Sequence, residues 1–84
     1  MIKCFIVECM ENINKGNFDL GGLYIAKISN NDHNVYSVLD KNKNWVPFNC
    51  YGPDSYKKYF NEFNIFYIEN KKEMNKYIEE SPLY

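Results

Sequence analysis

The sequence contains no arginine, because all ten of its basic residues are lysine, and eleven acidic residues bring the net charge to −1. Lysine lacks the planar guanidinium fork that binds phosphate or carboxylate groups through two parallel hydrogen bonds. The balanced charge excludes the strongly basic class of nucleic-acid-binding proteins, which a high pI identifies. It also argues against a strongly acidic mimic of nucleic acid.

Long apolar runs are also absent. No stretch approaches the ~20 apolar residues that a membrane-spanning helix needs. The apolar start, MIKCFIVECM, contains Lys3 and Glu8 and lacks the longer apolar core and small-residue cleavage site of a secretory signal. We therefore expect a cytoplasmic protein with no membrane partner.

The three cysteines form no C-x-x-C pair, which argues against a metal site. Structural zinc sites usually draw ligands in pairs from short C-x₂₋₄-C segments. Cys4 and Cys9 are five positions apart, and on a regular strand they face opposite sides. With Cys50, they are expected to be buried thiols that pack as small apolar groups. No metal or other cofactor is predicted.

Catalytic motifs are missing as well. A cysteine nucleophile needs a base, and the single histidine, His33, lies in an Asn-rich turn with Asp32 or Asp40 as the candidate orienting carboxylate. No cysteine is flanked by the glycines that usually shape an oxyanion loop. The pair Gly21-Gly22 has neither the spacing nor the lysine of a phosphate-binding loop. The chain is therefore predicted not to be an enzyme.

Aromatic residues are abundant: eight Tyr, six Phe and one Trp in 84 residues. Each can bury roughly 150–250 Å², so a dense core is plausible without metals or disulfides. The chain is short, without repeats or a linker, and residues 1–84 are predicted to form one domain.

Five short segments read as β-strands, separated by polar turns: 2–9, 23–29, 35–40, 45–50 and 64–69. Asn-rich turns fall at 30–34 and 41–44. Pro47 lacks a donor N–H, which places the fourth strand at an edge or a bulge. This spacing of strands and turns is typical of a small barrel or sandwich.

Two segments have helical periodicity. In residues 53–63, Tyr56, Tyr59, Phe60 and Phe63 follow the i, i+3, i+4, i+7 pattern of an amphipathic helix. A second helix is predicted at about 71–80, with Asn70 and Glu73 as its capping pair and Pro82 ending it.

The layout of residues 18–63 resembles the small SH3-like β-barrel proteins encoded by phages and prophages of low-GC Gram-positive bacteria. The matching features are Leu20, Gly22 and Tyr24 in spaced order, a Tyr-x-Val-x-Asp strand at 36–40 and a hairpin into an aromatic-rich strand, preceded near the start of the chain by a Lys3-Cys4 strand. Two departures are Gly21-Gly22, where a charged residue is usual, and the last helix. The resemblance implies a mainly β (α+β) fold: a five-stranded SH3-like barrel with a helix between late strands and a C-terminal helix.

The only tryptophan, Trp45, directly follows a charged turn rather than an apolar run. On a regular fourth strand, Val46, Phe48 and Cys50 face the core, and Trp45, Pro47 and Asn49 face away. Tryptophan and tyrosine are preferred at the centres of protein interfaces. The predicted partner-binding residues are therefore Trp45, Tyr51, Tyr36, Lys43 and Asn49. The alternative is that the C-terminal helix covers Trp45 through Tyr77 or Ile78.

Acidic residues are concentrated in the last third of the chain. Glu69, Glu73, Glu79 and Glu80 are predicted to form an electrostatic face that steers the protein toward a basic partner. The alternative is helix capping and an ordinary solvated surface.

Together these features predict a non-catalytic protein-binding module of phage or prophage type that inhibits or redirects a host protein. A bacterial immune nuclease, in the manner of an anti-CRISPR protein, is one concrete target that would serve host-defence evasion. One alternative is a nucleic-acid-binding module with a Tyr/Trp/Lys sheet face: Tyr24, Lys27, Tyr36, Lys43, Trp45 and Tyr51. Another is a minor component of virion assembly, which homo-oligomerisation would favour.

Overall fold

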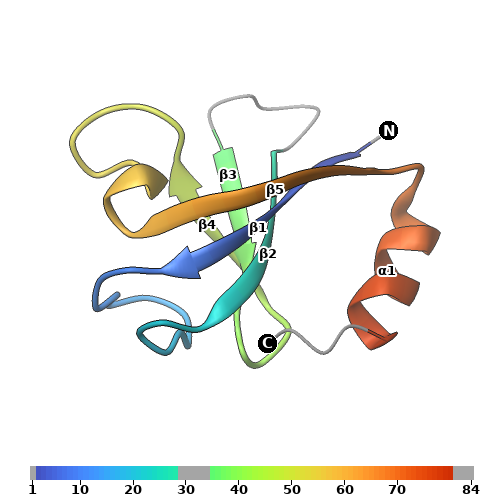
Figure 1. Cartoon of the computed structure of the whole chain (residues 1–84), viewed down its shortest axis with the longest axis horizontal. Coiled ribbons are helices and arrows are strands. Elements are labelled where there is room, and N and C mark those ends of the chain that lie inside the picture. The colour runs from blue at the N-terminus through green and yellow to red at the C-terminus, as the bar shows by residue number, and fades with distance from the viewer. Residues whose placement is uncertain (1, 29–34, 81–84) are drawn as a thin grey trace.

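The computed structural model describes residues 2–28 and 35–80 as one antiparallel five-stranded sheet followed by a helix (Figure 1). The strand order is β4-β3-β2-β1-β5, so β4 and β5 are the two edges. The elements are β1 (Ile2–Cys9), β2 (Leu23–Ile28), β3 (Val35–Leu39), β4 (Trp45–Asn49), a 3₁₀ turn η1 (Tyr56–Lys58), β5 (Phe60–Ile68) and α1 (Lys71–Glu80).

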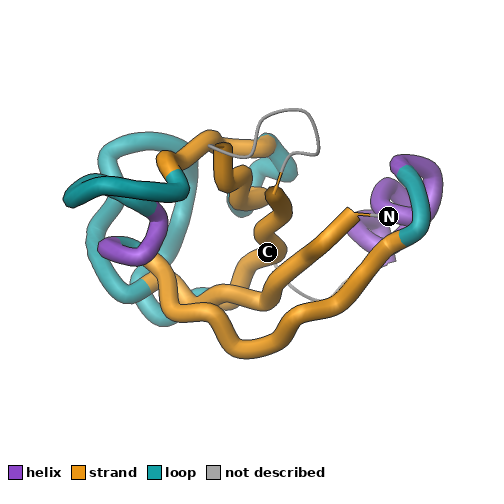
Figure 2. The backbone as a smooth tube through the Cα atoms, turned by 90° about the horizontal axis from the view of Figure 1, so that it is seen from above, coloured by secondary structure: helices purple, strands orange, loops and turns teal. Residues whose placement is uncertain are grey.

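The prediction of a mainly β fold with five strands and a C-terminal helix is confirmed. Closure into a barrel is not, because no ladder joins β4 to β5 within the described residues. The sheet is nevertheless strongly bent, and Figure 2 shows its strands curling around an interior with α1 at one end. The predicted turn at 30–34 and Pro82 lie outside the described residues.

Two apolar clusters pack on opposite faces of the sheet, as strand alternation requires. The larger one contains alternate residues of β1 together with aromatic residues of the other strands: Phe5, Val7, Cys9, Tyr24, Ala26, Tyr36, Val38, Val46, Phe48, Cys50 and Phe60. The smaller one, beneath α1, contains Cys4, Ile68 and Met74, with Trp45 and Ile78 packed against it. The predicted facing of β1 and β4 is therefore confirmed.

The predicted helix at 53–63 is wrong. The chain makes only one 3₁₀ turn there, and β5 begins at Phe60 rather than at residue 64. Tyr56 stacks on Tyr36 with ring centroids 3.7 Å apart, and Phe60 packs edge-to-face on Phe48 at 5.2 Å. The segment from Phe60 forms a strand rather than a helix because β5 completes the hydrogen bonding of β1 along the whole length of β1.

The predicted C-terminal helix is confirmed as α1. The side-chain oxygen of Asn70 accepts a hydrogen bond from the Glu73 backbone N–H (2.9 Å), which satisfies one of the unpaired donors at the helix start. Met74 is buried against Cys4 and Ile68, and Tyr77 packs on Phe66 at 5.2 Å. α1 is therefore fixed to the sheet face opposite the larger core.

Candidate protein-binding surface

The buried carboxylate of Asp40 joins two loops that lie far apart in the sequence. Asp40 is only 3% exposed. Its Oδ1 accepts hydrogen bonds from the N–H groups of Asn42 (2.9 Å) and Asn44 (3.0 Å), which close the β3–β4 turn. Its Oδ2 accepts one from the Asn17 N–H (3.1 Å) in the β1–β2 loop. Hydrogen bonds to an ionised acceptor are roughly twice as strong as neutral ones, so this residue holds the two loops together.

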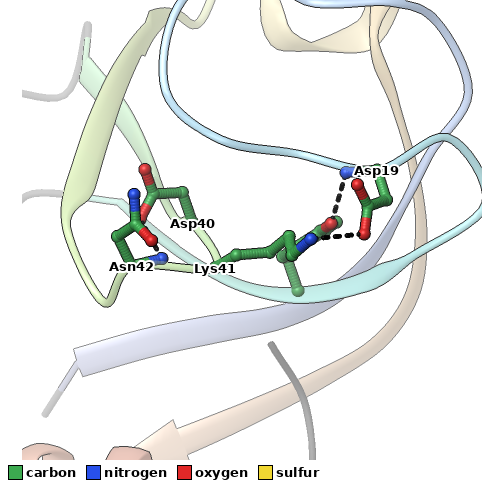
Figure 3. Close-up of polar contacts among 5 residues, drawn as sticks. Asp19, Asp40, Lys41 and Asn42 are labelled. Carbon is green, nitrogen blue, oxygen red and sulfur yellow. Dashed lines mark hydrogen bonds and ion pairs between the residues drawn. The ribbon is translucent and has the colours of Figure 1, made fainter.

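Lys41 adds a second connection between the same loops (Figure 3). Its backbone N–H donates to the Asn17 carbonyl (3.0 Å), and its Nζ forms an ion pair with Asp19 (2.8 Å). The Asp19 N–H in turn donates to the hydroxyl of Tyr24 (2.6 Å), a fully buried core residue. The turn that follows Asp19 is therefore anchored to both the hairpin and the core.

That turn, residues 19–22, folds back onto the end of β1. The Gly21 N–H donates to the Cys9 carbonyl (2.8 Å), and the Cys9 N–H donates to the Gly22 carbonyl (3.0 Å). Gly21 has a φ of 81°, which suits glycine because it lacks a Cβ. These bonds hold the backbone of the turn that carries Leu20 beside the end of β1, which Met10 follows, and Leu23 begins β2 directly after the turn.

Three large apolar side chains are exposed at this end of the molecule, and we call them the loop patch: Met10 (50% exposed), Leu20 (64%) and Leu23 (40%). Scattered single apolar residues on a surface are ordinary, but a group held on a hydrogen-bonded turn can mark a binding site. The sequence analysis missed these residues. The available signal was a set of large apolar side chains around a glycine pair in a polar loop.

Acidic side chains border the loop patch. Burial raises the pKa of the neighbouring Cys9 thiol, and three nearby carboxylates raise it further: Asp19, Glu11 and Glu8. Glu8 also lies directly opposite Leu23 across the β1–β2 ladder. Lys41, paired with Asp19, is the basic residue at this border. The patch is thus apolar at its centre and acidic around it.

The residues predicted to contact a partner do not form one surface. Tyr36 is fully buried in the larger core, so its prediction as a contact residue is wrong. Trp45 is half-buried against the smaller core, with the Lys27 Nζ 4.2 Å from its ring. Trp45 and Ile78 pack on the same cluster, as the alternative interpretation expected. Tryptophan is large and apolar, and here it fills the space between the sheet and α1.

The other three predicted contact residues are exposed but separated. Lys43 lies in the β3–β4 turn, where its φ is 64°. Asn49 and Tyr51 lie at the opposite end of β4, and Tyr51 is 74% exposed. Lys43 precedes the five-residue strand β4, whereas Asn49 is its last residue and Tyr51 lies beyond it. These side chains therefore cannot act as one compact site.

The core around Tyr36 contains a polar group that the sequence analysis did not predict. The Tyr36 hydroxyl is buried, and no group of the described residues meets it with hydrogen-bond geometry. Burial raises its pKa far above the ordinary value, and the nearby Glu62 carboxylate raises it further. Burial likewise raises the pKa of Tyr56, whose ring stacks on Tyr36, to about 12. Both phenols therefore stay protonated at neutral pH.

The acidic residues of the last third lie among lysines. Glu69, Glu73 and Glu79 are exposed, and the side chain of Glu80 lies outside the described part of the chain. Residues 69–80 contain these four glutamates together with Lys71, Lys72 and Lys76. Glu73 also stands in the first turn of α1, next to the Asn70 cap. The segment is therefore nearly neutral rather than a strongly acidic face.

The residues considered for cysteine catalysis and for metal binding do not lie together in the structure. Cys4 packs in the smaller cluster and Cys9 in the larger one, on opposite faces of β1, as predicted. His33 and Asp32 lie outside the described residues, and Asp40 is occupied by three backbone donors. Within residues 2–28 and 35–80, no group of His, Cys, Asp or Glu is placed to hold a metal ion.

The sheet face considered for nucleic acid is largely unavailable. Tyr24 and Tyr36 are fully buried, so neither ring can stack on a base. Lys27 lies over Trp45, and burial lowers its pKa, with nearby Lys71 adding to the decrease. Four residues of this set therefore serve packing in the folded chain, namely Tyr24, Tyr36, Lys27 and Trp45, whereas Lys43 and Tyr51 are exposed at opposite ends of β4.

No helix in the described part of the chain is long and apolar enough to cross a bilayer. Comparison with protein-family models, curated proteins and solved structures found no match to this chain.

Proposed function

We propose that the chain is a non-catalytic protein-binding module, and that the loop patch is its contact surface. The observation that carries this proposal is the exposure of Leu20, on a turn that hydrogen bonds hold in place, together with Met10 and Leu23 at the ends of the two strands that the loop connects. Anchoring the turn through Asp40 and Tyr24 lowers the entropy that the loop loses on binding. A preorganised apolar group of this kind suits the centre of an interface.

The border of the patch suggests the charge of the partner. Glu8, Glu11 and Asp19 outnumber Lys41, so the complementary surface has an apolar hollow bordered by basic residues. Enzymes that act on nucleic acids carry such basic grooves. A host protein of this class, with a bacterial immune nuclease as the concrete example, is the target that we propose.

The setting of this function belongs to the same proposal. The strand order, in which the last strand returns beside the first after a 3₁₀ turn, is compatible with an open SH3-like arrangement. The resemblance of the Lys3-Cys4 strand and the Tyr-x-Val-x-Asp pattern alone leads us to propose a phage- or prophage-type protein that acts in the cytoplasm of a bacterium. Inhibition or redirection of the host protein would follow from occupying its basic groove.

Binding kinetics test the proposal on a partner protein recovered from a lysate of a low-GC Gram-positive bacterium. Leu20→Ser should weaken equilibrium binding by about tenfold or more, the loss typical of a central apolar contact. Glu11→Gln should mainly slow association, with a smaller salt dependence, because it removes a steering charge at the edge.

Tyr51→Ala is the matched control, since Tyr51 is more exposed than Leu20 but lies in the loop after β4. Tyr51→Ala should leave both the equilibrium dissociation constant and the association rate constant unchanged. Unchanged affinity for Leu20→Ser, with the variant folded, would show that the loop patch is not the contact surface.

A further inference from the structure

The two edges of the sheet are protected very differently. On β4, Pro47 lacks a backbone donor, the Lys15 Nζ donates to the Pro47 carbonyl, and Ser55 forms a bridge with Asn49. Proline, lysine and covering segments are the usual devices that prevent an edge strand from pairing with another chain. The β4 edge is therefore closed to further strands.

The β5 edge has few of these devices. Residues 60–68, FNEFNIFYI, contain neither proline nor lysine, and Glu62 is their single charged residue. β5 pairs with β1 on one side, and within the described residues its other side pairs with no strand. One bulge is present, where Phe63 is the extra residue opposite Ile6 and Val7. Asn64–Ile68 beyond it remains regular and open to pairing.

Three large apolar side chains project from one face of this open strand, and we call them the β5 stripe: Phe63 (54% exposed), Ile65 (57%) and Tyr67 (61%). Ile65 lies opposite Phe5, and Tyr67 lies opposite Lys3, on the face of the larger core. α1 packs against the other face through Met74, so it does not cover the stripe. An open edge beside exposed apolar side chains can pair with a strand of another chain.

From this we propose that β5 pairs with β5 of a second copy, antiparallel, about a two-fold axis normal to the sheet. Such an axis keeps each face on the same side in both copies, so the numbers of opposed residues must sum to an even value. A sum of 130 places Ile65 opposite its own copy and Phe63 opposite Tyr67 in both directions. Cross-strand aromatic pairs of this kind are stabilising.

The same register avoids electrostatic conflict. Glu62 lies before the bulge and Glu69 lies beyond the end of β5, so neither acidic residue is among residues 63–67, which this register pairs. The stripe is therefore complementary to itself in both shape and charge.

The buried area predicts a weak and reversible dimer. With about 200 Å² for a large apolar side chain, the stripe exposes on the order of 350 Å² per copy. The two stripes and the backbone of the paired strands together bring the total surface buried in the dimer toward ~1,200 Å², the lower end of the range for specific interfaces. A dissociation constant on the order of 10 to 100 μM is expected. The dimer leaves the loop patch uncovered, so it is independent of the proposed function.

Sedimentation velocity between about 1 and 200 μM tests the dimer, over a range that brackets the expected dissociation constant. The mass should rise from 10.1 kDa toward twice that value. Ile65→Lys, which removes the two-fold contact and adds like charges, should stay monomeric throughout. Tyr51→Lys, an exposed aromatic outside the stripe, should dimerise like the unaltered chain.

Thiol cross-linking gives a second, independent measurement. The Ile65→Cys variant should be joined into a dimer by a short bismaleimide, whereas the Tyr51→Cys variant should not, and the three native thiols are buried and unreactive. A monomer at about 200 μM, a dimer that survives Ile65→Lys, or an assembly larger than two copies would each overturn the proposal. So would the absence of cross-linking in the Ile65→Cys variant under conditions where the chain is dimeric.

Discussion

Replacement of Asp40 by alanine is expected to release the β1–β2 loop, which carries Leu20 of the loop patch, from the β3–β4 turn. The change removes an acceptor for three backbone N–H groups: those of Asn17, Asn42 and Asn44. A hydrogen bond to a charged group contributes ~1.5–3 kcal/mol, but water can solvate donors in exposed turns, so the total loss is about 3 kcal/mol. For a domain of this size, that lowers the melting temperature by roughly 15 °C.

Circular dichroism melting and urea titration measure this loss directly. Asp40→Asn provides a graded comparison. Its remaining oxygen can accept from Asn42 and Asn44, but its amide nitrogen cannot accept from Asn17, so about half of the loss is expected. Asp54→Ala is the control, because this exposed residue pairs with Lys58 at 3.5 Å and should change stability by less than ~0.5 kcal/mol.

A second readout connects this stability to binding. Since Asn17 leads into the turn that carries Leu20, Asp40→Asn should also weaken partner binding while most molecules remain folded. If Asp40→Ala melts within about 3 °C of the unaltered chain, the carboxylate contributes far less than charge-assisted bonding implies, and the anchoring argument fails.

Two further predictions concern the smaller core and the buried ionisable groups. Trp45→Ala should destabilise the fold by about 2 kcal/mol, less than for a fully buried tryptophan because Trp45 is half-exposed, and urea titration beside Tyr51→Ala would measure it. A change in the free energy of unfolding below ~0.5 kcal/mol would instead indicate that Trp45 is a surface residue rather than part of the smaller core. Burial raises the pKa of the Cys4 thiol to about 11, although Lys27 lowers it, and raises the pKa of Tyr56 to about 12. The unfolded chain ionises at lower pH, so stability should be full below pH ~9 and fall as pH rises toward 12, by about 2 kcal/mol at pH 11 from Cys4 alone. A urea midpoint that stays constant from about pH 8 to pH 11 would contradict this assignment.

Strand alternation made much of this architecture predictable. In β4, buried apolar residues recur at every second position, which directed Phe48 into the core, and in β1, where both faces are apolar, the two-residue period of a strand placed Cys4 and Cys9 on opposite faces. The same alternation placed Trp45 outside the larger core, and in the structure Trp45 packs against the smaller cluster beneath α1. The Asn70 cap was predictable too, because it depends only on neighbouring residues.

Features that depend on distant partners were not predictable. Tyr56, Tyr59, Phe60 and Phe63 satisfy the spacing of a helix, yet pairing with β1 draws the last two into a strand. Which tyrosine is buried and which leucine is exposed depends on how the loops meet, and the contact between Asn17 and Asp40 joins residues 23 positions apart. The candidate site therefore emerged from the fold rather than from the sequence.

The most direct test of the account compares three immobilised proteins in one bacterial lysate: the unaltered chain, Leu20→Ser and Tyr51→Ala. Quantitative mass spectrometry would measure the host proteins that each retains. The account predicts a basic protein held equally by the unaltered chain and Tyr51→Ala, and reduced about tenfold or more on Leu20→Ser. Equal retention of the same proteins by all three would contradict it.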